Sequence, residues 1–205
     1  MREIYQITCV GQPEERLLCA APKAWLENWY PAGEGAYCPR TYGQLLRTPY
    51  GLYGRMVCRE NFPMALQRMP NCPVCTDSCM EFFLNPEPER DTFLNLEMNS
   101  RGTLLMGLNV AGKFGCLDPS LQAGCFPRAY VDEEKGEWEI RFCIPDRLLK
   151  QLFPTYDPER DRRMTGNFYK CGDATGMPHY GSWNPVSRDP IDFHCPECFG
   201  ELILI

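Results

Sequence analysis

Short runs in which apolar and polar residues alternate are the main pattern along this chain. The segment 92–98 (TFLNLEM) is an example, because its odd and even positions would point to opposite faces of a strand. Such a period of two predicts half-buried β-strands. By the same criterion, strands are predicted over 52–59, 78–84, 92–98, 102–108, 137–144, 166–171 and 199–205.

The segments between these runs indicate how the strands are connected. Asn99-Ser-Arg separates two of the runs, 92–98 and 102–108, and predicts a hairpin. The 17 glycines and 19 prolines are scattered between the apolar runs, which favours many turns, and 109–128 is expected to be a long loop. We therefore expect an all-β fold, an antiparallel β-sandwich of the immunoglobulin-like or jelly-roll type.

The helical signal is weak, and we expect one or two short helices. The segment 146–153 (DRLLKQLF) places its leucines and its phenylalanine on one face, and Pro154 ends it. A helix of about two turns would connect strands rather than form a layer. The sequence contains no internal repeat, and we expect residues 1–205 to form a single domain.

The charge and hydropathy of the 205 residues exclude some partners. The formal net charge is −6 and no basic face is visible, so no nucleic-acid partner is expected. No apolar run approaches the roughly 18 residues that a membrane helix needs, so no membrane partner is expected either. Residues 1–10 do not resemble a secretory signal, which predicts a cytoplasmic protein. The oligomeric state stays open.

The segment 167–184 (NFYKCGDATGMPHYGSWN) mixes aromatic, charged and polar side chains with three glycines. A sugar site needs this mixture, because an aromatic ring covers the apolar face of a sugar while polar groups bind its hydroxyls. Phe168 is expected in the core, but Trp183 lies in a polar turn and is predicted to stack on a ligand. The candidate ligand-binding residues are Trp183, Tyr180, His179, Lys170, Asp173, Asn167 and Glu81.

The carboxylates of 72–83 (CPVCTDSCMEFF) allow two interpretations each. Asp77 either caps a turn or belongs to a site. Glu81 would share a strand face with Cys79 and Phe83, so it is either satisfied inside the sandwich or placed at a site. Pairs such as Asp77 with Glu81, or Asp173 with Glu197, would fit a sugar-modifying enzyme. No catalytic motif supports an enzyme, and the chain has only two histidines.

The 13 cysteines suggest an alternative site. Without a leader peptide, the default is reduced thiols that pack as small apolar residues, as expected for Cys58, Cys143 and Cys171. Two C-P-x-C pairs could instead bind zinc. The zinc alternative uses Cys72, Cys75, Cys195 and Cys198, with His194 and Cys79 as further donors.

Six strings in order resemble the carbohydrate-binding module family 9, over residues 50–205. They are DSCMEFFLNP (77–86), FLNLEMNSRGTLL (93–105), WEIRFCIP (138–145), NFYKCGD (167–173), PHYGSWNPV (178–186) and DFHCPECFGELI (192–203). The resemblance implies a β-sandwich that binds a carbohydrate without cleaving it.

The resemblance also implies details of the site. Family 9 modules hold a terminal sugar between two tryptophans, and some carry structural calcium, although no cofactor is required. Trp183 corresponds to one stacking ring. Cys75 stands where the second ring is expected, and Trp138 shares a face with core residues of its strand. Cys195 stands where a basic residue is expected.

Overall fold

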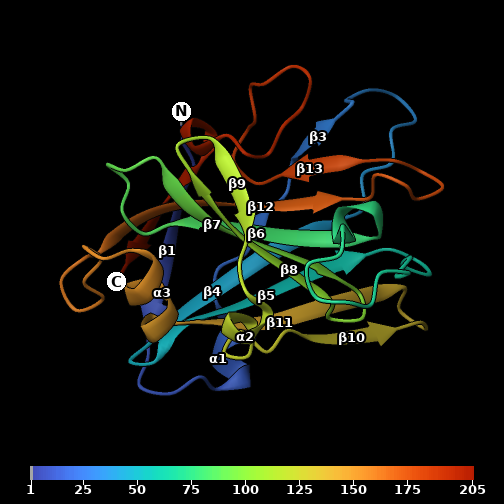
Figure 1. The fold of residues 1–205 in the computed structure, drawn as a ribbon. Helices are drawn as coiled ribbons and strands as arrows, with labels where there is room; N and C mark the ends of the chain where they lie inside the picture. The colour runs from blue at the N-terminus through green and yellow to red at the C-terminus, as the bar shows by residue number, and fades with distance from the viewer. Residues whose placement is uncertain (1) are drawn as a thin grey trace.

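A computed structural model describes residues 2–205 and shows a β-sandwich with three short α-helices in that range (Figure 1). The strands are β1 (Ile4–Cys9), β2 (Ala24–Trp25), β3 (Asn28–Tyr30), β4 (Thr41–Thr48), β5 (Gly51–Arg59), β6 (Cys79–Asn85), β7 (Thr92–Asn99), β8 (Leu104–Val110), β9 (Lys113–Cys116), β10 (Arg128–Asp132), β11 (Glu137–Pro145), β12 (Arg163–Cys171), β13 (Tyr180–Ser182) and β14 (Gly200–Leu204). The helices are α1 (Glu15–Ala20), α2 (Pro119–Gln122) and α3 (Asp146–Leu152), with 3-10 turns η1 (Val74–Thr76) and η2 (Pro196–Cys198).

The strands form one hydrogen-bonded path that folds over itself into two layers. Its order is β10-β11-β5-β4-β1-β14-β12-β6-β7-β8-β9. Strand β1 joins the layers, because its first residues pair with β14 and its last residues pair with β4. Figure 1 shows β3 and β13 side by side at one end, where β13 also pairs with β12.

The core lies between the two layers and follows from the alternation in the sequence. Phe82 of β6 packs at ring-centroid distances of 5.8 Å from Phe142 of β11 and 4.8 Å from Phe168 of β12. The layers approach closely at Gly43, where a Cβ would lie only 2.3 Å from the ring of Phe168. Each large apolar side chain buried here contributes about 1.5–3 kcal/mol to folding.

The structure confirms the predicted β-sandwich. All seven predicted strands are present, the hairpin joins β7 to β8 in antiparallel register, and the helix predicted over 146–153 is α3. Strand β1 differs from the expected pattern, since both of its pairings are parallel. The expected loop 109–128 is partly regular, because it contains β9 and α2. A third helix, α1, was not predicted.

The first 50 residues supply β1 to β4, so they contribute strands to both layers. Trp29 and Tyr30 of β3 pair with β13. The assignment of residues 1–205 to a single domain remains a prediction. Among residues 2–205, no helix is long and apolar enough to cross a membrane.

Candidate functional site

A cavity of about 520 Å³ lies on the outer face of the layer that contains β12, β6, β7 and β8. This face of the strands points away from the core between the two layers. The segment 172–199 partly covers it. The cavity is lined by Pro73, Cys75, Glu81, Glu97, Leu105, Asn109, Gly112, Phe114, Cys171, Asp173, Tyr180, Ile191, Asp192, Phe193 and His194. Its wall therefore combines carboxyl groups, thiols, an amide, an imidazole and aromatic rings.

Two glutamates lie opposite each other in the cavity wall. Glu81 of β6 and Glu97 of β7 are cross-strand partners, with exposed fractions of 3% and 6%. Burial raises the pKa of Glu81 well above its usual value, and Glu97 raises it further. Burial also raises the pKa of Glu97 to about 7. Because two buried carboxylates repel each other, the pair holds a proton near neutral pH.

Asp173 and Tyr180 form a second polar group beside the glutamates. The backbone N–H of Asp173 donates to the carbonyl of Cys75 (2.9 Å), which fixes this second residue after β12 against η1. Burial raises the pKa of Asp173, although hydrogen bonds from Cys75 and Tyr180 oppose the rise. Tyr180 lies on β13, which pairs with the end of β12, so strand pairing holds its phenol next to Asp173.

His194 also lines the cavity, and its ring has a defined orientation. Its Nε2 lies 2.9 Å from Nδ2 of Asn95, and its Nδ1 lies 3.1 Å from Oδ1 of Asp192. Because an amide nitrogen can only donate, Nε2 of His194 accepts and Nδ1 donates to Asp192. The imidazole is thus hydrogen-bonded both to the sheet, through Asn95, and to the covering segment 172–199, through Asp192.

Phe114 of β9 is the exposed aromatic ring of the cavity, with 44% of its surface accessible. Its ring centroid lies 5.7 Å from that of His194 in an edge-on arrangement. One side of the ring covers Gly107 of β8, where a Cβ would lie 2.2 Å from Cε2 of Phe114. A glycine is therefore required at 107 for this position of the ring.

Asn109 of β8 contributes an unpaired acceptor. It is 3% exposed and lines the cavity, and its Oδ1 has no hydrogen-bond partner among residues 2–205. A buried amide oxygen without a donor costs about 1–3 kcal/mol. A ligand that donates a hydrogen bond would remove this cost.

Of the seven predicted ligand-binding residues, Glu81, Asp173 and Tyr180 line the cavity. Trp183 does not, and its predicted stacking role needs correction. It is 7% exposed and packs edge-on in the core, with its ring centroid 6.2 Å from that of Tyr5 and 6.0 Å from that of Phe168. A ring enclosed in this way has no free face for a sugar.

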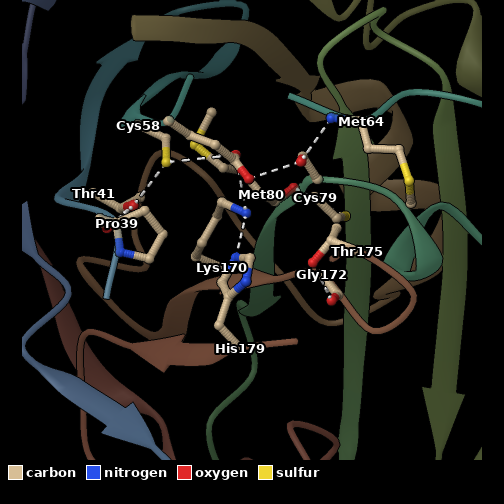
Figure 2. Close-up of polar contacts among 12 residues, drawn as sticks. Pro39, Thr41, Cys58, Met64, Cys79, Met80, Lys170, Gly172, Thr175 and His179 are labelled. Atoms are coloured by element: carbon tan, nitrogen blue, oxygen red, sulfur yellow. Dashed lines mark hydrogen bonds and ion pairs between the residues drawn. The ribbon is translucent and has the colours of Figure 1, made fainter. Parts of the chain in front are cut away.

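Lys170 and His179 do not line the cavity, and Figure 2 shows the amine of Lys170 directed toward His179. Nζ of Lys170 donates to Nε2 of His179 (2.7 Å) and lies 3.3 Å from Oε2 of Glu60. Glu60 also accepts from Nε1 of Trp138 (2.9 Å) and from Oγ of Ser78 (2.8 Å). This buried polar network joins the two layers, so these two candidates support the fold rather than line the cavity.

Asn167, the remaining candidate, also has a structural position. It is fully buried and its Nδ2 donates to the carbonyl of Asn184 (2.9 Å), while its Oδ1 accepts from the N–H of the same residue. These bonds fasten the covering segment to β12.

Sequence reasoning missed several cavity residues. Glu97, Asn109, Phe114, Asp192 and His194 were not among the predicted ligand-binding residues. The alternation of β7 carried a usable signal for Glu97, because it shares one face with Phe93 and Asn95 as Glu81 does with Phe83. Nothing local marks Phe114 or Asn109, because their position depends on the pairing of β8 with β9.

The structure does not assemble the predicted zinc site. Cys195 and Cys198 form a disulfide with each other, so their sulfurs are not thiolates, and the expectation of reduced thiols is wrong for this pair. Within residues 2–205, the single cluster of at least three potential metal ligands is Cys79, Glu81 and Cys171. Two thiols in three donors do not suit calcium, which prefers oxygen ligands.

The two carboxylate pairs considered for an enzyme do not converge either. Asp77 accepts from the backbone N–H groups of Leu66 (3.0 Å) and Gln67 (2.9 Å), so it fixes a loop. Glu197 is exposed and pairs with Arg188 at 2.9 Å. Only Glu81 and Asp173, one from each pair, reach the cavity.

The family model for carbohydrate-binding family 9 matches residues 27–204, and the chain belongs to this family. Family 9 is a family of non-catalytic carbohydrate-binding modules. The resemblance seen in the sequence is thereby confirmed. The comparison with curated proteins finds no match.

Solved structures share the fold. A candidate carbohydrate-binding protein from Bacteroides uniformis ATCC 8492 is 26% identical, with a TM-score of 0.83 and 100% of both chains covered. A family 9 module from Caldicellulosiruptor kristjanssonii in complex with cellotriose is 10% identical, with a TM-score of 0.67 and 98% of this chain and 93% of that chain covered. A family 9 module from the same organism in complex with glucose is 10% identical, with a TM-score of 0.66 and 99% of this chain and 96% of that chain covered.

Proposed function

We propose that this protein binds a carbohydrate without transforming it, and that the ligand enters the cavity by a terminal sugar residue. Family membership supports the ligand class, and the solved family 9 modules are complexes with glucose and cellotriose. The observation that carries the proposed site is the unpaired Oδ1 of Asn109 in a cavity that also contains a proton-sharing pair of glutamates.

The polar groups of the cavity match the chemistry of sugar hydroxyls. A hydroxyl both donates and accepts a hydrogen bond. Asn109 offers an acceptor, while Glu81 and Glu97 together offer acceptors and one proton to donate. Asp173 and Tyr180 add a further acceptor and donor at one end. Several hydroxyls of one sugar ring can therefore be bound at once.

Phe114 is the aromatic ring that we propose to stack on the sugar, in place of Trp183. It is 44% exposed in the cavity, whereas Trp183 is enclosed in the core. Stacking would cover the apolar C–H face of the ring, a contact of about 0.5–1.5 kcal/mol beyond simple burial. One stack and several hydrogen bonds give an expected affinity between about 1 µM and 1 mM.

Titration calorimetry with glucose and cellotriose tests the proposal. Wild type should give saturable heat with at least one of them, and the sugar should be recovered unchanged after incubation. Phe114→Ala and Asn109→Ala should each weaken binding by about tenfold, which is about 1.4 kcal/mol. Phe126→Ala, which removes an exposed ring outside the cavity, is the matched control. Sugar binding that survives both cavity variants would refute the proposed site, and sugar turnover would refute the non-catalytic function.

A further inference from the structure

Two cysteines and a glutamate converge from neighbouring strands, and two of the three, Glu81 and Cys171, line the cavity. Cys79 of β6 lies opposite Cys171 of β12 in the antiparallel register, and Glu81 follows two residues along β6 on the same face. The ligand atoms of the three residues all lie within 4.8 Å of one another. Sγ of Cys171 is 2.9 Å from Oε1 of Glu81. All three side chains are buried, with exposed fractions of 0%, 2% and 3% for Cys79, Cys171 and Glu81.

The strands hold these three donors in a suitable arrangement for a metal ion. Residues at i and i+2 of one strand point to the same side, and the cross-strand partner of residue i completes a triangle. Zinc sites with an open coordination position use three protein ligands. Glu81 and Cys171 both line the cavity, so the fourth position of an ion bound here would face it.

The cluster has no cationic partner in the described part of the chain. None of the ion pairs among residues 2–205 includes Glu81, Glu97 or Asp173, which line the cavity together with Cys171. Lys170 is adjacent to Cys171 in sequence and its amine donates to the backbone carbonyl of Cys171 (2.9 Å), but the charged partner of this amine is Glu60, at 3.3 Å. A divalent ion bound here would supply the positive charge that balances these groups once they lose their protons.

We infer that Cys79, Glu81 and Cys171 form a site for Zn²⁺, with the fourth position open to the cavity. Thiolate ligands favour zinc over the hard cations calcium and magnesium. On binding, each thiol loses its proton to solvent and forms a Zn–S bond, and Glu81 contributes one oxygen. These three ligands differ from the C-P-x-C cysteines, of which Cys195 and Cys198 are joined to each other. The inference does not depend on the proposed sugar binding.

The test uses the full chain, reduced and freed of metal. Competition with a chromophoric chelator measures zinc affinity and stoichiometry, and cobalt substitution reports thiolate ligands through their charge-transfer absorption. We expect about one zinc per chain. Cys79→Ser, Cys171→Ser and Glu81→Gln should weaken zinc binding, with a loss of more than about 100-fold for each cysteine variant. Cys125→Ser is the matched control, because Cys125 is also fully buried but lies in the core away from the cavity.

Three results would overturn the inference. One is the absence of zinc uptake by reduced wild type, including the case in which mass spectrometry instead finds a Cys79–Cys171 disulfide. Another is retention of zinc in both cysteine variants. The third is a cobalt complex of wild type without a thiolate band, a readout that needs no variant to fold. Sugar titrations in the presence of a chelator, on the same preparation, separate failure of the zinc site from failure of the sugar site.

Discussion

Glu81 and Glu97 are direct cross-strand partners whose side chains meet on the cavity side of the sheet, where both are almost fully buried. Like charges directly opposite each other on a sheet are destabilising. The pair therefore holds its carboxyl groups in a state that costs stability unless a proton or a ligand is shared between them. This relationship places a strained polar pair at the site that we propose for the sugar.

Glu97→Gln should stabilise the metal-free protein. The amide keeps a similar size and removes one of the two buried like charges, so we expect the free energy of unfolding at pH 8 to rise by about 1 kcal/mol. Urea denaturation in the presence of a chelator measures this change. Glu134→Gln, at an exposed turn, is the control and should change stability by less than about 0.5 kcal/mol. A variant less stable than wild type would contradict the strained pair.

Trp183→Ala should affect folding rather than sugar recognition. Its ring packs against Tyr5 and Phe168, and its Cζ3 would lie 2.5 Å from a Cβ at Gly200. Removing such a buried ring typically costs about 3–5 kcal/mol of stability. Denaturation measures the loss, and calorimetry at low temperature on the folded fraction should give a sugar affinity within about twofold of wild type. A stable variant that no longer binds sugar would restore Trp183 to the site.

Glu60→Gln should strongly destabilise the protein, because it leaves the ammonium of Lys170 buried without its carboxylate. Breaking a buried ion pair by removing one partner costs about 3–5 kcal/mol. Glu201→Gln is the control, since it breaks the partly exposed pair with Arg163 (2.7 Å) and should cost less than about 1 kcal/mol. Equal losses in the two variants, measured by urea denaturation, would contradict a structural role for the buried network.

His179 should make stability depend on pH. Burial, followed by the neighbouring ammonium of Lys170, lowers its pKa to about 4, although the carbonyl of Met177 and the carboxylate of Glu60 oppose the shift. The ring of Tyr37 also packs on it, at a centroid distance of 5.0 Å. The unfolded state binds a proton at this histidine near pH 6.5, and the folded state does not. The neutral, buried His179 therefore makes its full contribution to the free energy of unfolding above pH 6.5. This contribution is lost as pH falls toward 4.

We therefore expect stability to fall between pH 7 and pH 4 by as much as about 3 kcal/mol from this group. His179→Gln retains an acceptor for Lys170 but does not titrate. Urea midpoints of wild type and variant, compared at pH 7 and pH 5, isolate the histidine from other groups. The wild type should lose more stability than the variant over this interval, and parallel losses would show that His179 does not bind the proton.

The sequence by itself determined the strands and hence the fold class. A period of two is a local property, and in 78–84 and 92–98 it correctly separates residues such as Phe82 and Leu96 from Glu81 and Glu97. The sequence also predicted the short helix α3, because Pro145 and Pro154 flank a segment with a helical pattern of apolar residues. The family resemblance rested on strings along these same elements, and it gave the ligand class.

Only the tertiary structure decided which face of each strand carries the site. Alternation separates two faces but does not say which one meets the other layer, and in β6 and β7 the polar face is also buried, under the segment 172–199. Strand pairing then brings Glu81, Glu97 and Cys171 together from distant positions, while core packing removes Trp183 from the surface. The positions of these side chains depend on contacts between residues far apart in sequence, so a local sequence pattern does not predict them.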